Sequence, residues 1–239
     1  MVYDVYSMPK TVLNQVFGYS SFRELQEEII LSLLNAKDCI AIMPTGSGKS
    51  LCYQIPALKL EGCTLVISPL IALMEDQVMA LKQLGISAAY WNSSLSTADY
   101  VDLQQSLRTG SLKLLYLAPE RLFIESVMDI LKTVKISLVA IDEAHCISEW
   151  GHDFRPHYRQ LSSLKTMFPS CPILALTATA TERVLDDIKT QLSLSDSVLF
   201  RSSFDRHNLY YDIRPKKNTV VQVMQFIEKQ GHGSGIIYC

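Results

Sequence analysis

The chain has 239 residues, of which 48% are hydrophobic and 19% charged, and its formal net charge is −2. This composition supplies a packed core and excludes a disordered chain, and the near-neutral charge excludes nucleic-acid binding by bulk positive charge, leaving only local patches. The six scattered cysteines lack a C-x-x-C pair and favour reduced thiols, and no apolar run nears the ~18 residues that span a membrane.

Apolar residues recur at helical spacing over 10–17 and 22–34, with Gly18 between them. The apolar run 39–43 predicts a buried strand, and a helix is expected from near Gly48. Similar runs predict strands at 63–68, 87–90, 113–117, 136–141 and 172–176, and helical spacing predicts helices at 70–84, 97–108, 121–131, 156–168 and 181–192.

Strands that are apolar throughout and alternate with helices predict an α/β fold, with a parallel sheet covered by helices on both faces. Right-handed crossovers place the carboxyl ends of such strands at one edge, where ligands bind in open α/β sheets. The segments that follow a predicted strand are therefore expected to meet at this edge: 44–50, 68–70, 142–145 and 177–179.

The pattern changes after about residue 200. Residues 209–213 are interpreted as a strand or a linker, 219–229 predict a helix, and an apolar strand is expected to begin at 236–238. One helix and one strand cannot bury a core alone. We therefore expect a first domain over 1–205 and the link and opening of a second domain over 206–239, with residues 236–239 exposed, disordered or paired with another chain.

The segment PTGSGKS (44–50) lies between the first predicted strand and a helix. It matches the phosphate-loop pattern G-x-x-x-x-G-K-[ST] except that Met43 stands at the first glycine. Glycines let backbone N–H groups turn toward phosphate, and the helix N-terminus favours negative charge. Lys49 is expected to reach the β- and γ-phosphates of a nucleotide, and Ser50 to ligate Mg²⁺. The alternative is a turn with a surface lysine. The predicted nucleotide-binding residues of this loop are Thr45, Gly46, Ser47, Gly48, Lys49 and Ser50.

The apolar run 136–141 ends directly in Asp142 and Glu143. Asp142 is placed to hold Mg²⁺ and Glu143 to orient and deprotonate an attacking water, so with Lys49 they form the predicted catalytic group. Two adjacent acids repel each other unless a cation lies between them, which favours a metal site over two solvated acids. His145 is either a structural histidine or a sensor of the bound nucleotide.

Two further groups surround these motifs. A glutamine amide can pair with the adenine edge, so Gln26, with Tyr19 or Arg23 stacked on the base, is a candidate contact; the alternative is exposed helix residues. Behind the acids, aromatic rings offer stacking faces worth ~1–3 kcal/mol per base, and basic side chains can meet phosphate; the alternative is core aromatics and a capped helix. The candidate DNA-binding residues are Trp150, His152, Phe154, Arg155 and Arg159.

These motifs, in this order, resemble the N-terminal part of RecQ-type DNA helicases of superfamily 2 over nearly the whole chain. The block DEAHCISEWGHDFRPHYR (142–159) is specific to that family, whereas a phosphate loop and DExH alone indicate only a nucleotide-driven motor. The other matching segments are GYSSFRELQEEII (18–30), MPTGSGKSLCYQIPAL (43–58), SPLIALMEDQV (68–78), APERL (118–122), LTATAT (176–181), SFDRHNL (203–209) and SGIIYC (234–239).

The resemblance implies a RecA-like motor lobe that uses ATP with Mg²⁺ to unwind DNA 3′–5′ in repair or recombination, on single-stranded or partially duplex DNA. It implies adenine contacts for Tyr19, Arg23 and Gln26, and a loop at 146–159 that couples DNA to hydrolysis. His145, Thr177 and Thr179 are implied to link hydrolysis to lobe movement. The resemblance also places Ser68, Asp76 and Gln77 near the DNA track. The implied compartment is the cytoplasm or nucleoid of a bacterium, or a nucleus.

Some positions depart from the family pattern. Ser47 replaces a frequent glycine, Glu149 brings negative charge near DNA, and His207 stands where proline is common. The family completes its ATP site with arginines of the second lobe, and its zinc site and winged-helix domain are not found in these 239 residues. We therefore expect no zinc here, binding of ATP·Mg²⁺ and of single-stranded DNA weakly, and little hydrolysis or unwinding.

Several functions stay open at this point. The first is an ATP-dependent DNA helicase, represented by its first lobe, and the second is a truncated ATP- and single-stranded-DNA-binding module without turnover of its own. A phosphate-loop kinase or transporter ATPase is disfavoured because DEAH and the 150–154 loop have no role there. RNA remains possible as the substrate because the loop does not read a 2′-hydroxyl. The oligomeric state is open.

Overall fold

The computed structural model describes residues 8–92, 95–203, 209–231 and 233–238. The chain divides into two compact units, Met1–Phe204 and Asp205–Cys239, a boundary one residue from the expected one. Among the described residues, no helix is both long and apolar enough to cross a membrane.

The first unit is built on a seven-stranded sheet in the order β3-β4-β2-β5-β6-β1-β7. Every neighbouring pair of strands is parallel, which confirms the predicted α/β fold class. All carboxyl ends therefore lie at one edge. The strands are β1 (Cys39–Ile42), β2 (Cys63–Ile67), β3 (Ala88–Trp91), β4 (Leu114–Leu117), β5 (Ile136–Ile141), β6 (Ile173–Thr177) and β7 (Val198–Arg201).

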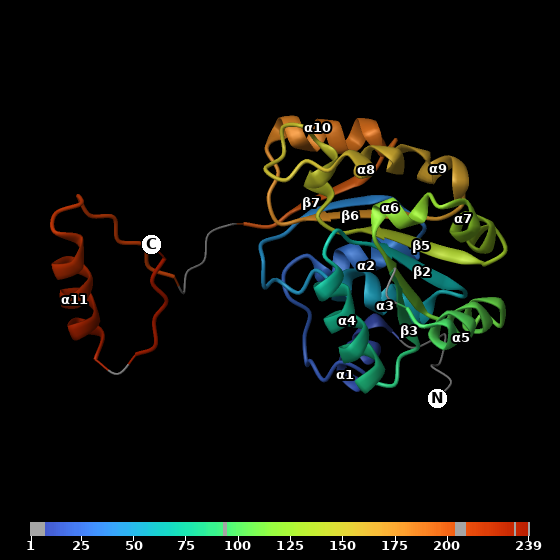
Figure 1. The fold of residues 1–239 in the computed structure, drawn as a ribbon, viewed down its shortest axis with the longest axis horizontal. Helices are drawn as coiled ribbons and strands as arrows, with labels where there is room; N and C mark the ends of the chain where they lie inside the picture. The colour runs from blue at the N-terminus through green and yellow to red at the C-terminus, as the bar shows by residue number, and fades with distance from the viewer. Residues whose placement is uncertain (1–7, 93–94, 204–208, 232, 239) are drawn as a thin grey trace. The chain divides into compact units, whose positions relative to one another are not determined.

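Helices cover both faces of this sheet (Figure 1). One face packs against α1 (Pro9–Gln15), α2 (Gln26–Leu34), α3 (Leu51–Lys59) and α4 (Ile71–Gln83). The other packs against α5 (Thr97–Arg108), α6 (Pro119–Leu122), α7 (Glu125–Lys132), α8 (Pro156–Arg159), α9 (Leu164–Met167) and α10 (Glu182–Gln191). Successive strand side chains point to opposite faces, so Ile40 and Ile42 enter one core and Cys39 and Ala41 the other.

Three details of the first unit differ from the sequence prediction. Strand β7 was not expected; it pairs with β1 at the sheet edge, and its residues are only half-buried or exposed. The helix expected at 121–131 is divided into α6 and α7, because Ile124 is in an extended conformation between them. The helix expected at 156–168 is divided into α8, a 3-10 turn at Gln160–Ser163, and α9.

The second unit contains the expected helix, α11 (Thr219–Gln230), none of whose side chains is buried. Residues 209–213 and 233–238 form no strand, so the strand expected from Ile236 is absent from the described residues. Ile236, Ile237 and Tyr238 are 81%, 61% and 91% exposed, as expected for unpaired apolar residues. His207, most of the predicted link at 203–209, and Cys239 lie outside the described residues.

Candidate nucleotide-binding site

A cavity of about 300 Å³ opens at the carboxyl edge of the sheet. It is lined from one side by the phosphate loop after β1, with Lys49 and Ser50, and from the other by Asp142 and Glu143 after β5. Only β6 lies between β1 and β5 in the sheet, so strand order brings together segments that are far apart in sequence. Thr45, Gly46 and Gly48 also line the cavity, whereas Ser47 is not among its lining residues and its buried Oγ has no hydrogen-bond partner in the described structure.

The phosphate loop is held from behind by the start of α2. The Gln26 Nε2 atom donates to the carbonyl oxygens of Ser47 and Gly48, at 3.1 and 3.0 Å, and Arg23 donates to the Gly46 carbonyl. The Arg23 backbone N–H in turn donates to Gln26 Oε1 at 2.8 Å. A Cβ atom at Gly48, where φ is +82°, would lie 2.5 Å from Gln26 Nε2. The Gln26 amide therefore holds the loop, and its close approach adds to the positive φ in favouring glycine at this position.

The lysine of the loop is also anchored to the backbone. Lys49 Nζ donates to the Met43 carbonyl oxygen at 3.2 Å. Met43 itself is fully buried, and its N–H donates to the Thr177 carbonyl at 3.0 Å. Met43, which stands at the first glycine position of the phosphate-loop pattern, thus joins the loop to the end of β6.

The acid pair is built on a sharp turn at the end of β5. The Asp142 N–H donates to Ile67 O at 2.8 Å, and Glu143 follows with φ +48°, a left-handed conformation that costs a non-glycine residue energy. The Glu143 N–H donates to Asp142 Oδ1 at 3.0 Å, and Tyr158 Oη donates to the Asp142 carbonyl at 2.9 Å. The strained turn places two carboxylates beside each other at the cavity wall.

The two carboxyl groups differ in their electrostatic environment. Burial, together with the charge of Glu143, raises the pKa of Asp142 to about 6. A hydrogen bond from His145, whose Nδ1 lies 3.3 Å from Glu143 Oε2, lowers the pKa of Glu143. Glu143 is therefore ionised at neutral pH, and the ionised form of Asp142 is destabilised in the absence of a compensating cation.

The three predicted coupling residues lie together. Buried His145 has its Nδ1 2.9 Å from Thr177 Oγ1, at the end of β6. The Thr177 hydroxyl proton is donated to the Thr179 carbonyl at 3.0 Å, so the Nδ1–H of His145 is the donor and is shared between Thr177 Oγ1 and Glu143 Oε2. A continuous hydrogen-bonded path thus runs from Glu143 through His145 to the segment after β6.

The candidate adenine contacts lie beside the cavity of about 300 Å³ lined by Lys49, Ser50, Asp142 and Glu143, here called the phosphate cavity. Tyr19, Arg23 and Gln26 line a second cavity of about 470 Å³, which shares Gly48 and Ser50 with the first. Tyr19 is 52% exposed and is open to stacking, whereas Gln26 is only 1% exposed because its amide contacts the loop. Their adenine-binding role stays a prediction.

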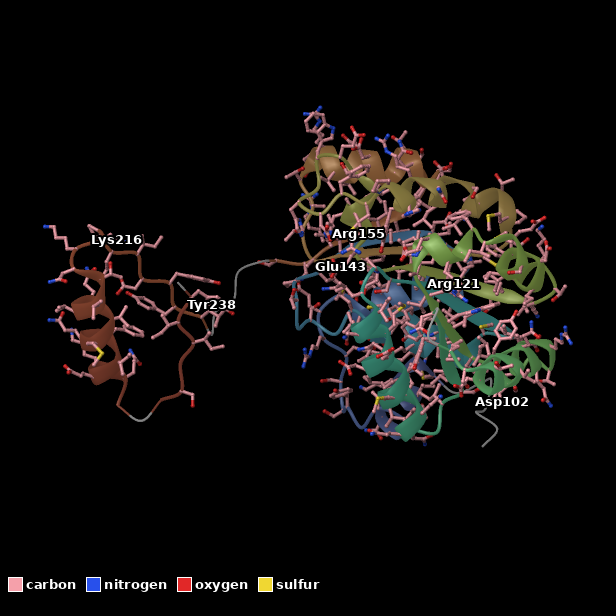
Figure 2. All side chains as sticks on the ribbon, in the orientation of Figure 1. Asp102, Arg121, Glu143, Arg155, Lys216 and Tyr238 are labelled. Carbon is pink, nitrogen blue, oxygen red and sulfur yellow. The ribbon has the colours of Figure 1, made fainter. Side chains whose placement is uncertain are left out.

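The candidate DNA-binding residues follow β5 on the segment 150–159, which ends in α8, and Figure 2 labels Arg155. Arg155 Nη2 pairs with Asp153 at 3.0 Å and its Nη1 donates to the Pro69 carbonyl at 3.2 Å. Arg159 pairs with Glu149 at 3.1 Å and lies over the Phe154 ring, so this glutamate neutralises a neighbouring arginine. The His152 ring stacks on His145 with 4.0 Å between centroids, and Trp150 is 57% exposed.

Sequence reasoning did not assign several residues of the phosphate cavity. The buried residues Tyr53, Val66, Met74 and Tyr116 also line it. Ser68 and Gln77, which the family resemblance placed near the DNA track, line this cavity, and Gln77 Oε1 accepts a hydrogen bond from Gln54 Nε2 at 2.9 Å. The place of Ser68 could be predicted because it stands at the end of a predicted strand, whereas the helix face that carries Gln77 could not.

Comparisons with known proteins place the chain in a family. The DEAD/DEAH box helicase family model matches residues 23–188. The ATP-dependent DNA helicase RecQ of Pasteurella multocida is 52% identical over 228 residues, covering 95% of this chain and 36% of the relative. RecQ of Bacillus subtilis is 46% identical over 231 residues, covering 96% of this chain and 39% of the relative. ATP-dependent DNA helicase Q1 of Mus musculus is 44% identical over 242 residues, covering 96% of this chain and 37% of the relative. The chain thus spans well under half the length of these relatives.

Solved structures share the fold. A hypothetical ATP-dependent RNA helicase from Sulfolobus tokodaii superposes with a TM-score of 0.62 at 21% identity, covering 81% of this chain and 56% of that one. The DUF1998 helicase MrfA superposes with a TM-score of 0.67 at 17% identity, covering 93% of this chain and 36% of that one.

The identities to RecQ proteins confirm the resemblance inferred from the motifs. Because the family model covers more than half of its length, the chain belongs to the DEAD/DEAH box helicase family.

Proposed function

We propose that this chain carries the ATP·Mg²⁺ site and part of the DNA-binding surface of a RecQ-type 3′–5′ DNA helicase. One observation carries the proposal: Lys49, Ser50 and the acid pair line the same cavity at the carboxyl edge of the sheet. A lysine, a hydroxyl and two carboxylates around one cavity suit a magnesium-bound triphosphate.

The residues present fit Mg²⁺ held jointly with a nucleotide. Mg²⁺ binds through one or two carboxylates, waters and substrate phosphates rather than through an all-protein cage. Burial raises the pKa of Asp142 to about 6, so its carboxylate gains stability from a nearby cation. Ser50 lines the same cavity. No group of three or more potential metal ligands occurs among the described residues, so the ion is expected to require the nucleotide. When bound, Mg²⁺ neutralises phosphate charge.

Each side chain then has a distinct role. Lys49, already held toward the loop, supplies positive charge to the β- and γ-phosphates. Glu143 is ionised and oriented by His145, so it can accept a proton from the attacking water. A change in the charge or position of Glu143 is transmitted to Thr177 and Thr179 through the hydrogen bonds of His145.

DNA is the proposed polymer. The exposed Trp150 offers a stacking face, and the names of the relatives quoted above specify DNA helicases. The test compares the affinity of the chain for single-stranded DNA and for RNA of the same sequence, measured by fluorescence anisotropy. Equal or tighter binding of RNA contradicts the choice of DNA.

The nucleotide site is tested by thermal unfolding of the 239-residue chain with and without ATP and Mg²⁺. Ligand at one hundred times its Kd stabilises a native protein by ~2.7 kcal/mol, so a rise of several degrees in Tm is expected. Lys49→Ala should abolish this rise. Lys132→Ala, at a 66%-exposed side chain in a surface ion pair, should retain it. An unchanged Tm of the wild-type chain with ATP·Mg²⁺ rejects the proposal.

A second candidate is a nucleotide- and DNA-binding module without turnover. One observation favours it: no arginine of the described chain lines the cavity that contains Lys49 and Asp142. An arginine at the transferred phosphate accelerates such reactions by about 10³–10⁵. Robust DNA-stimulated ATP hydrolysis by the chain alone would exclude this candidate, whereas nucleotide binding with negligible hydrolysis supports it.

A further inference from the structure

We propose that Arg183 is a positioning residue that holds Trp150 as a stacking platform for a base of single-stranded DNA. The inference rests on the proposed function, because it assigns a DNA role to a residue of α10 outside the recognised motifs. Sequence reasoning had no signal for it, since the two residues belong to different segments that meet only in the folded chain.

The contact itself is close and directional. The Arg183 guanidinium carbon lies over the Trp150 indole, 3.2 Å from the ring centroid, and the side chain of Trp150 remains 57% exposed. Arginine stacks on aromatic faces through its planar, weakly hydrated guanidinium, and tryptophan is the strongest cation–π partner. One face of the indole is therefore held by α10, and the exposed remainder is available to a base.

Arg183 differs in this respect from the other arginines of the region. Arg155 and Arg159 are each paired with a carboxylate, at 3.0 and 3.1 Å. No ion pair joins Arg183 to a carboxylate within the described part of the chain, and its closest characterised contact is the indole. Its charge is therefore directed at Trp150 rather than neutralised by an acid.

A second contact shows that α10 holds this part of the loop. Ser148 Oγ donates to Asp187 Oδ2 at 2.5 Å and accepts the Trp150 backbone N–H at 3.1 Å. Asp187 and Arg183 are four residues apart on α10, so they share one face of the helix. The side chain and the backbone of Trp150 are thus both fixed from the same helix face.

A hollow beside the indole provides room for a ligand. A cavity of about 340 Å³ is lined by Trp150, His152, Thr179 and Thr181, and reaches His145. Thr181 is the N-cap of α10, where its side chain accepts the Val184 N–H at 3.3 Å. A base placed there contacts the platform and also lies against the segment that is hydrogen-bonded to His145.

The test measures binding of fluorescein-labelled oligo(dT) to the 239-residue chain by anisotropy. Arg183→Gln should weaken binding about fivefold, the equivalent of ~1 kcal/mol for a cation–π contact. Arg183→Lys, which keeps the cation, should recover part of the loss, and Arg108→Gln on α5, with the same charge change, should bind like wild type. The Tm rise with ATP·Mg²⁺ should stay unchanged in all of them.

A double-mutant cycle with Trp150→Ala separates positioning from direct phosphate contact. If Arg183 acts through Trp150, Arg183→Gln has no further effect in the Trp150→Ala background. Equal losses in both backgrounds, with a salt slope smaller by about one, indicate a direct phosphate contact and overturn the inference. Wild-type affinity in Arg183→Gln overturns it as well. A wild-type chain that fails to bind the oligonucleotide overturns the DNA part of the proposed function and the inference together.

Discussion

The phosphate cavity and the loop 146–159 lie at the same sheet edge but are held by different forces. The cavity walls follow fully buried strands, and its loop is fixed by hydrogen bonds from Gln26 and Lys49 to backbone carbonyls. The loop 146–159 is held by exposed ion pairs, which are worth only ~0–1 kcal/mol each, by ring contacts, and by hydrogen bonds from Arg155 to the Pro69 carbonyl and from Ser148 to Asp187. The first region is continuous with the core, whereas the exposed side chains of the second depend on weaker contacts at the surface.

The loop nevertheless has two fixed ends. Cys146 and Tyr158 are fully buried, and the Tyr158 hydroxyl donates to the Asp142 carbonyl. Gly151 is packed against the backbone, because a Cβ there would lie 2.4 Å from His145 O. The exposed middle of the loop is therefore tied at both ends to the residues that line the nucleotide cavity.

The largest expected effect tests the rigidity of the cavity. Gly48→Ala combines a positive φ, costing ~1–2 kcal/mol, with a clash against Gln26, so unfolding stability should fall by about 2–5 kcal/mol and the Tm rise with ATP·Mg²⁺ should disappear. Gly46→Ala is the matched control, with the same φ of +82° but open space around its Cβ. Equal losses in the two variants would show that Gln26 does not fix the loop.

A pH experiment tests the electrostatics of the acid pair. The pKa of Asp142 is raised to about 6 from 3.8, so the native state binds its proton more tightly than the unfolded chain does, and the stability associated with that proton is lost as pH rises through 6. Asp142→Asn should therefore stabilise the metal-free protein by about 1–3 kcal/mol at pH 8, and the gain should shrink toward pH 5.

Glu143→Gln should change the unfolding stability in the opposite direction and destabilise the protein. The pKa of Glu143 is lowered, so its contribution to stability is present above pH 4.5, its ordinary value, and is lost only as pH falls through the lower native value. This variant should be less stable than wild type from pH 5 to 8 in urea unfolding without divalent ions. Shifts of the same sign in the two variants would contradict the description of the pair.

The smallest expected effect concerns the loop. Glu149→Gln releases Arg159 from its 3.1 Å pair, with both side chains about half exposed, so stability should change by less than ~0.5 kcal/mol. Affinity for oligo(dT) should rise about two- to fivefold, because a negative charge is removed and an arginine is freed for phosphate. Anisotropy titration measures the change. A loss of the Tm rise with ATP·Mg²⁺ in this variant would show that the two regions are not separable.

Most elements of the first unit could be predicted because a continuous apolar run indicates a buried strand and apolar residues at helical spacing indicate a helix. Strand β7 could not, since it is a four-residue edge strand that pairs only with β1 and has no buried apolar run. The strand expected from Ile236 fails for a related reason. An apolar run specifies a strand only where a neighbour pairs with it, and no partner strand occurs among the described residues of the second unit.

The sequence alone determined which chemical groups line the cavity, because a glycine-rich loop and an acid pair at the ends of buried parallel strands must meet at one edge. The tertiary structure decided which partners the side chains around the cavity and the loop 146–159 have, and therefore which of them are available to a ligand. It directs the Gln26 amide into the phosphate loop, pairs Arg155 and Arg159 with acids, and sets Arg183 over Trp150. Strand periodicity fixes where a segment ends, but side-chain partners across the fold depend on packing geometry that no local pattern encodes.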